Sequence, residues 1–292
     1  MQNRRDFLKK TSLLVAGSIV APGVFSSSPF PFSNGKRIGL QLYSLRGMVR
    51  EEGIQATLEA VAKIGYNNLE TAGYNDGKIY GLAPRDFKKR VEDLGMEVTS
   101  AHLGQSYSRE KDSEVMAWWD KAIEAHHEMG ASYMIQPSMA VNNKSALDDL
   151  KMYCDYFSEV GARTAKADIS FGFHNHAGEF KKIGDHVMYD FMLNNTDKKV
   201  VLFELDVYWC VVGGADPVEY LKKYPRQIKL THIKDEKEIG QSGMMDFDAI
   251  FKQMKSNKIK DWYVEIERYT NNDPIASAKQ SFEYLNNAPY VK

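Results

Sequence analysis

Ionisable side chains gather at two places between residues 200 and 235, each at the end of an apolar run. The first run ends with Glu204 and Asp206, and the second ends with His232 and Lys234. The segment between them has a helical pattern, so the stretch predicts strand, helix, strand. Because strand side chains alternate between faces, the two members of each pair point the same way. A carboxylate and an imidazole at the carboxyl ends of successive parallel strands could supply half of a divalent-metal site.

The same arrangement recurs along the chain from Arg37 onward. Short apolar runs alternate with amphipathic helical patterns, and each apolar run ends in polar or ionisable groups. Burying such groups without partners is costly, so they must meet one another, water or a metal ion. The further strand-end residues are Gln41, Tyr43, Glu70, Ser100, His102, Gln136, His174, His176, Glu179, Glu265 and Glu267.

The spacing of these runs predicts the fold. Strands are expected at 38–43, 68–71, 98–102, 133–136, 170–174, 200–206, 228–234 and 262–267. Helices are expected at 54–64, 84–94, 113–129, 144–167, 184–195, 217–223, 247–256 and 274–285. Eight βα units between residues 37 and 292 predict an α/β protein, a single-domain (β/α)8 TIM barrel of the usual size. The alternative is an open doubly wound sheet, but no Gly-rich phosphate turn follows the first strand.

One set of strand-end residues suits a metal ion best. Glu179, Asp206, His232 and Glu265 come from four consecutive predicted strands. Three carboxylates and one imidazole would suit Mn²⁺, Mg²⁺, Co²⁺ or Zn²⁺, with positions left open for substrate oxygens. This ligand set is too hard for a closed structural zinc site.

Other residues at the strand ends have plainer explanations as well. We favour Glu204 as a salt-bridge partner inside the barrel. His174 and His176 form only a weak zinc signal, because no third histidine or cysteine accompanies them. Tyr43 and Trp209 fit packing and sugar stacking about equally well.

Several segments of the chain resemble a known family. They are residues 173–180, 205–209, 232–235 and 264–265, and the resemblance extends over the chain from residue 38 onward. The chain is similar to the xylose isomerase-like sugar phosphate isomerase/epimerase family, which includes tagatose 3-epimerase and inosose dehydratase relatives. The resemblance implies metal ligands at the ends of strands five to eight. They carry over to Glu179, Asp206, His232 and Glu265, with Glu267 as the alternative to Glu265.

The chemistry expected of such a site is metal-assisted proton abstraction next to a sugar carbonyl. Glu179 or Glu265 would act as the base and the other would return the proton. His102, His176 and Lys234 would hold hydroxyls or protonate a leaving group. The residues expected to bind substrate are Gln41, Tyr43, His174, His176, Glu204, Trp209 and Glu267.

Several reactions fit this site. Proton return gives an epimerase or an isomerase, whereas loss of a β-oxygen gives a lyase or dehydratase acting on a 3-keto-glycoside or inosose-type substrate. A glycosidase with paired carboxylates would need no metal, and a sugar-binding barrel would lack chemistry. DNA-acting relatives with the same barrel are disfavoured, because 38 basic and 39 acidic residues leave a net charge of −1.

The N-terminus has the order of a Tat export signal. Arg4 and Arg5 precede an apolar run at 13–20 and then small residues. We therefore expect a signal peptide at 1–28, a Ser/Pro-rich linker at 29–36 and a catalytic barrel at 37–292. The expected location is the periplasm, where phosphorylated sugars are rare, so an unphosphorylated sugar is the expected partner. We expect no nucleic acid and no stable membrane anchor, and a homo-oligomer is possible. Cys154 and Cys210 are expected to stay unpaired.

Overall fold

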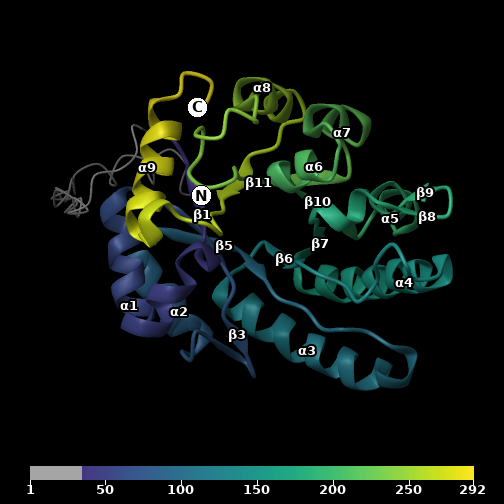
Figure 1. The fold of residues 1–292 in the computed structure, drawn as a ribbon. Coiled ribbons are helices and arrows are strands. Elements are labelled where there is room, and N and C mark those ends of the chain that lie inside the picture. The colour runs from purple at the N-terminus through teal and green to yellow at the C-terminus, as the bar shows by residue number, and fades with distance from the viewer. Residues whose placement is uncertain (1–34) are drawn as a thin grey trace, which may run out of the picture.

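The structure is a computed structural model that describes residues 35–292. The signal peptide and most of the linker predicted from the sequence lie outside the described residues. The described chain forms a closed barrel of parallel strands surrounded by helices (Figure 1). This confirms the predicted single (β/α)8 TIM barrel.

The barrel strands follow one another around the barrel in chain order. They are β1 Gly39–Gln41, β2 Asn68–Thr71, β5 Glu97–His102, β6 Tyr133–Gln136, β7 Ser170–His174, β10 Val201–Asp206, β11 Ile228–Ile233 and β12 Asp261–Val264. The barrel closes where β1 pairs in parallel with β12, with Leu40 opposite Val264. Each strand overlaps its predicted range, but β1 and β12 end earlier than predicted, at Gln41 and Val264.

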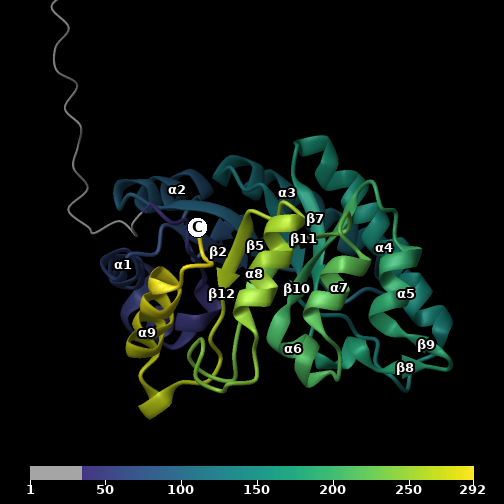
Figure 2. The ribbon, with the colours of Figure 1, turned by 90° about the horizontal axis from the view of Figure 1, so that it is seen from above.

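The helices lie outside the barrel and cover the outer faces of the strands (Figures 1 and 2). They are α1 Arg46–Ile64, α2 Pro84–Asp93, α3 Asp112–Met129, α4 Leu147–Thr164, α5 Met188–Asn195, α6 Val207–Val212, α7 Pro217–Lys223, α8 Phe247–Ser256 and α9 Pro274–Asn287. Asp216 and Asp273 cap α7 and α9 through their side chains, and a proline follows each cap. Gly65 and Gly130 end α1 and α3 in the left-handed conformation.

The structure adds elements that the sequence did not predict. Helix α6 begins directly after β10, because the side chain of Asp206 caps it by accepting the N–H of Trp209. Two short hairpins, β3–β4 (Tyr74–Asn75 and Lys78–Ile79) and β8–β9 (Lys182–Ile183 and His186–Val187), leave the barrel after β2 and β7. Helix α1 starts earlier than expected but is broken at Gly53, and its second part matches the predicted helix 54–64.

The barrel interior has an apolar floor and a polar upper part. Ile135, Leu230 and Tyr263 form a buried cluster inside, against which Leu202 packs. Every second strand residue points inward, and on three of these strands the next inward side chain is polar. Leu202 is thus followed by Glu204, and Leu230 by His232. A polar site at the carboxyl end therefore rests on an apolar base.

Candidate active site

Four buried side chains converge at the carboxyl end of the barrel. His174, Asp206, His232 and Glu265 come from the last four strands or directly after them, and each offers one ligand atom within 4.8 Å of the others. A second group, His102, His174, Glu204 and His232, meets the same distance criterion. The two groups share His174 and His232. Each shared imidazole therefore has one ring nitrogen available to each group.

The two nitrogens of each shared ring point to different carboxylates. His174 places Nδ1 3.2 Å from Glu204 Oε2 and Nε2 4.0 Å from Asp206 Oδ2. His232 places Nε2 2.6 Å from Glu70 Oε2 and Nδ1 3.3 Å from Glu265 Oε2. Metal-bound histidines usually donate their other ring N–H to a carboxylate. The arrangement fits His174 Nε2 and His232 Nδ1 as ligand atoms, with Glu204 and Glu70 supporting the rings.

A buried hydrogen-bond network holds these supporting carboxylates in place. His102 Nε2 lies 2.7 Å from Glu204 Oε2. Glu70 accepts hydrogen bonds of 2.6 Å from Gln41 Nε2 and from Ser100 Oγ. Glu204 is fully buried and meets three imidazoles, which agrees with its expected role as an ion-pair partner inside the barrel.

One oxygen in the group of His174, Asp206, His232 and Glu265 has no hydrogen-bond partner. It is Oδ2 of Asp206, a fully buried residue. Asp206 is held firmly, because its other oxygen caps α6 and the Asn175 side chain bonds to its backbone N–H and C=O. Burial raises the pKa of Asp206 to about 7, and the charge of Glu265 adds to this while Lys234 opposes it. An unpartnered carboxylate oxygen in a buried group of two imidazoles and two carboxylates fits a divalent cation.

Lys234 provides a fixed positive charge beside this group. Its Nζ donates to Glu265 Oε2 at 2.8 Å, lies 3.1 Å from Glu267 Oε2, and sits 5.6 Å from the centre of the Trp209 ring. Although burial opposes it, Lys234 together with His232 holds the pKa of Glu265 well below its usual value. Glu265 is therefore ionised at neutral pH. It is one of the four candidate ligands, whereas the side chain of Glu267 contacts only Lys234.

Glu179 does not belong to the group of His174, Asp206, His232 and Glu265. The candidate ligand set in the structure therefore differs from the one inferred from the sequence. The residue lies in the 3-10 helix Ala177–Phe180, beyond the end of β7. Its Oε2 accepts the backbone N–H of His176 at 2.8 Å and closes a local capping box. It belongs to neither group of candidate ligands, and His174, at the end of β7 itself, stands in its place.

The residues expected to bind substrate lie at different depths. Gln41 and Glu204 are fully buried, and both carry hydrogen bonds inside the network, so they support the site from below. His174 belongs to both groups of candidate ligands. His176 and Trp209 remain only partly buried beside each other, with ring centres 5.8 Å apart.

The rim of the site carries an exposed aromatic ring. Tyr43 follows β1 and is 44% exposed. The guanidinium of Arg46 lies 4.5 Å from the centre of the Tyr43 ring and donates to the Tyr269 hydroxyl at 2.8 Å. Arg46 and Tyr269 were not predicted to belong to the rim, because the contact between them joins residues 223 positions apart.

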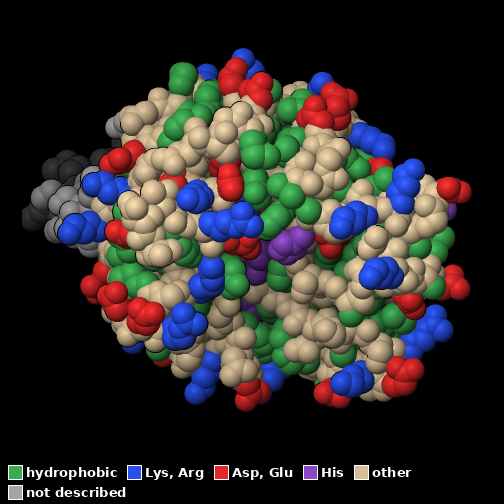
Figure 3. Space-filling view, viewed as in Figure 1, with side chains coloured by type: hydrophobic (Ala, Val, Ile, Leu, Met, Phe, Trp, Pro, Cys, Tyr) green, Lys and Arg blue, Asp and Glu red, His purple; other side chains and the backbone are tan. Residues whose placement is uncertain are grey.

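Figure 3 shows the same face of the molecule as a surface. Histidine side chains lie near its centre, with lysine and arginine side chains close by.

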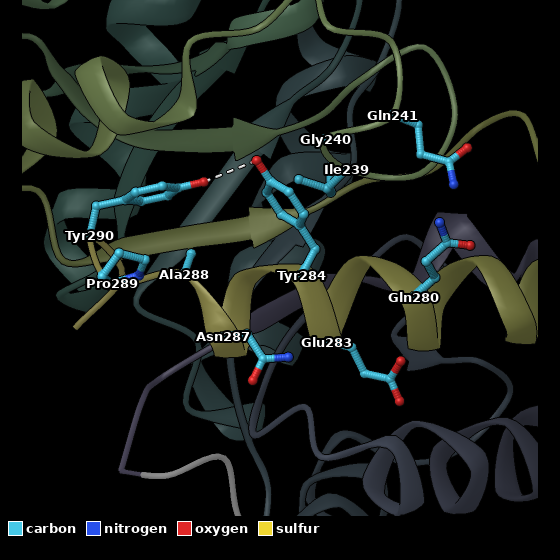
Figure 4. A pocket seen from close by; sticks show the side chains of 10 residues that line it. All are labelled: Ile239, Gly240, Gln241, Gln280, Glu283, Tyr284, Asn287, Ala288, Pro289 and Tyr290. Carbon is cyan, nitrogen blue, oxygen red and sulfur yellow. Dashed lines mark hydrogen bonds between the residues drawn. The ribbon is translucent and has the colours of Figure 1, made fainter.

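A separate pocket of about 650 Å³ lies outside the barrel, between α9 and the loop after β11 (Figure 4). It is lined by residues such as Gln241, Tyr284 and Tyr290 and shares none with the histidine groups. The chemistry of the barrel mouth is therefore separate from that pocket.

A closed parallel barrel with ligand residues at the ends of its last four strands defines a (β/α)8 barrel with its candidate active site at the usual end. The family described as xylose isomerase-like TIM barrel matches residues 58–288. The chain belongs to this family.

Solved and curated relatives agree with this assignment. A sugar phosphate isomerase/epimerase from Parabacteroides distasonis is 39% identical, with a TM-score of 0.84 over 88% of this chain and 100% of that one. An inosose dehydratase from Geobacillus kaustophilus is 24% identical over 61% of this chain and 60% of its own length, so the match spans well under two thirds of that relative. A 3-keto-D-glucoside 4-epimerase from E. coli shares the fold, with a TM-score of 0.62 and 18% identity over 80% of this chain and 94% of that one.

The cysteines and the helices bear on two other expectations. Cys154 and Cys210 are both free and buried, which confirms that they are unpaired. In the part of the chain that the structure describes, every helix is too short or too polar to span a membrane.

Proposed function

We propose that the protein is a metal-dependent enzyme that removes a proton next to the carbonyl of an unphosphorylated keto-sugar. The observation that carries this proposal is the buried group of His174, Asp206, His232 and Glu265, in which Asp206 Oδ2 lacks a hydrogen-bond partner. A divalent cation held there would polarise the substrate carbonyl and stabilise the charge that develops on its oxygen.

The chain's own residues supply the proton transfers. Glu265 is ionised and lies at the mouth of the barrel, so it is placed to accept the proton from the carbon next to the carbonyl. Burial acts to lower the pKa of Lys234, but nearby negative charges, above all that of Glu265, raise it overall. The ammonium therefore stays protonated and can donate to a sugar oxygen. Burial lowers the pKa of His176, which leaves a neutral imidazole beside Trp209 as a second group for proton transfer.

The charges at the site favour a substrate without phosphate. Lys234 is already neutralised by two carboxylates, and Arg46 is bound to the Tyr269 hydroxyl and two backbone carbonyls. Neither cation is available as a bidentate phosphate ligand. From the solved relative, a sugar phosphate isomerase/epimerase, we therefore infer only the type of reaction and not a phosphorylated substrate.

Two outcomes of the proton abstraction are open to this site. Return of the proton gives an epimerase or isomerase, which is our first proposal. The second is elimination, because Lys234 and His176 could protonate a leaving oxygen, and an inosose dehydratase is among the curated relatives. An exported, periplasmic location remains part of the proposal.

The test is metal analysis of the purified protein, followed by incubation of ketoses, inososes and 3-keto-glycosides in D₂O. We expect metal-dependent incorporation of deuterium at the carbon next to the carbonyl, together with either an epimer or an unsaturated product. Asp206→Asn should abolish both the bound metal and the exchange. Full turnover after complete removal of the metal would instead support a glycosidase.

A further inference from the structure

The amino-terminal end of the barrel, opposite the candidate active site, carries a concentration of basic side chains. Lys198, Lys199, Arg226 and Lys229 line a hollow of about 430 Å³ at the starts of β7, β10 and β11. Lys255, Lys258, Lys260 and Lys292 line a second hollow of about 460 Å³ beneath β12. Because β10, β11 and β12 are neighbours in the barrel, the two hollows adjoin. We call these eight side chains the basic end.

The positive charge of the basic end is not neutralised by the protein. All eight residues are exposed. Across residues 35–292, no carboxylate lies within 4.0 Å of any of their charged nitrogens, although ion pairs are common elsewhere on the surface. Asp168 borders the first hollow, and Asp197, next to Lys198, accepts the backbone N–H of Lys199 instead. Asp261 is already paired with Arg37. A chain with a net charge of −1 therefore concentrates uncompensated positive charge at one end.

The position of the basic end excludes a role in holding the sugar. The apolar floor of Ile135, Leu230 and Tyr263 separates it from the histidine groups, so an anion bound there cannot reach Lys234 or Glu265. The eight basic side chains come from several separate segments and are spread over two hollows. This spread matches an extended anionic surface better than one small anion.

The N-terminal part of the chain joins the fold at this same end. Residues 1–34, with Arg4, Arg5 and the apolar run 13–20, connect through Lys36 and Arg37 to the start of β1. Arg37 itself lines the second hollow. In Figure 2 the C-terminus lies near the starting ends of the last strands, which marks the same end of the barrel. The start of the barrel chain and the basic end therefore lie at the same end of the barrel.

We propose that the basic end docks the barrel onto an anionic phospholipid surface, with the candidate active site facing away from the lipid. Each lysine or arginine near such a surface adds to the electrostatic attraction. The attraction falls off with distance over about one Debye length, and it weakens as the salt concentration rises. The docking is peripheral and electrostatic. It leaves the mouth of the barrel open to a soluble sugar.

The experiment measures sedimentation of the full-length protein with vesicles. Vesicles of phosphatidylglycerol and phosphatidylethanolamine should bind it at low salt, and 0.5 M NaCl should release it. Pure phosphatidylcholine vesicles should bind it at least tenfold more weakly. A variant with Lys198→Gln, Lys199→Gln, Arg226→Gln and Lys229→Gln should bind the anionic vesicles about 100-fold more weakly, since it loses half of the basic end.

A matched control removes the same charge from the other end. Arg50→Gln, Lys78→Gln, Lys111→Gln and Lys144→Gln change exposed residues in segments that follow the carboxyl ends of barrel strands. This variant should bind the vesicles within about threefold of the unaltered protein. All three proteins carry the same N-terminal segment, so they differ only in the replaced side chains, and equal thermal melting shows that each is folded.

Three results would overturn the proposal. One is equal binding by the two variants, and another is vesicle binding that 0.5 M NaCl leaves unchanged. The third is binding of the basic end to alginate, an acidic polysaccharide, without binding to anionic vesicles.

Discussion

Glu204 Oε2 lies 3.2 Å from Nδ1 of His174, and this contact decides which nitrogen of the ring is free to face Asp206. The same oxygen also lies 3.2 Å from Nε2 of His232. One buried carboxylate thus orients both imidazoles of the candidate metal group. The site is built in two levels, with ligands above and supporting carboxylates below.

Replacing Glu204 by Gln should therefore weaken metal binding without removing a ligand. The amide can accept only through one oxygen and brings an N–H group toward the imidazoles. We expect the affinity for Co²⁺ or Mn²⁺ to fall roughly 10- to 100-fold, with a changed Co²⁺ absorption spectrum. Isothermal titration and visible spectroscopy measure the two effects. Glu267→Gln, which alters only a contact with Lys234, is the control and should leave the spectrum unchanged.

Replacing Asp206 by Asn tests the pH dependence of metal binding. Burial raises the pKa of Asp206 to about 7 in the metal-free protein, so a proton competes with the metal below that pH. Metal affinity should fall by up to about tenfold for each pH unit below 7. In Asp206→Asn the affinity should be at least about 100-fold lower and its dependence on pH shallower. An unchanged slope in the variant would show that another group is responsible.

The same pKa predicts how the stability of the metal-free protein changes with pH. A carboxyl whose pKa is higher in the folded protein than in the unfolded chain binds its proton more tightly when folded. The Asp206 carboxyl therefore makes its full contribution to the free energy of unfolding below about pH 4. That contribution is lost as the pH rises through about 7. Urea denaturation in EDTA between pH 5 and 8 should show Asp206→Asn gaining stability relative to the parent as pH rises.

Replacing Glu179 by Gln separates the ligand set of the structure from the one inferred from the sequence. Because the Glu179 carboxylate caps a local turn and lies outside both ligand groups, Gln should preserve the cap and leave metal affinity within about threefold. His174→Ala should lower the affinity by at least about 100-fold. The reverse order of the two variants would restore Glu179 as the ligand.

Replacing Tyr43 by Ala tests the rim of the site. An exposed ring stiffened by Arg46 offers a face for stacking against a sugar, which contributes about 1 kcal/mol. We expect KM to rise roughly five- to tenfold while kcat stays within about threefold, because the ring does not reach the reacting atoms. Tyr284→Ala removes a ring of similar exposure from the outer pocket in Figure 4 and should leave both constants unchanged.

Replacing Gly39 by Ala tests the closure of the barrel. A Cβ atom at this position would lie 2.5 Å from the backbone oxygen of Trp262 and 2.6 Å from the Tyr263 ring. Since a backbone oxygen in the closing strand cannot move aside easily, we expect a loss of about 2–3 kcal/mol in the free energy of unfolding. Gly47→Ala, where nothing lies within 4 Å, should be neutral or slightly stabilising. Chemical denaturation of both variants makes the comparison.

Local patterns in the amino-acid sequence were enough to predict the order of the elements and the end of the barrel where the candidate site lies. Strand alternation and helical periodicity are local properties, so residues such as Leu230 and His232 disclose their common face without knowledge of their neighbours. The Asp-Pro pairs before α7 and α9 fixed helix starts for the same reason. Asp206, His232 and Glu265 could thus be placed at one mouth from the chain alone.

The contacts between groups on opposite sides of the barrel could not be predicted from the sequence. His174, at the end of β7, belongs to both groups of candidate ligands, whereas Glu179 accepts a backbone N–H in a local turn beyond the strand. Glu70 meets His232 across 162 residues, and this contact selects the ring nitrogen left free for a metal. The basic end likewise combines loops from separate βα units. Such distances depend on strand register and closure, which no local pattern in the sequence specifies.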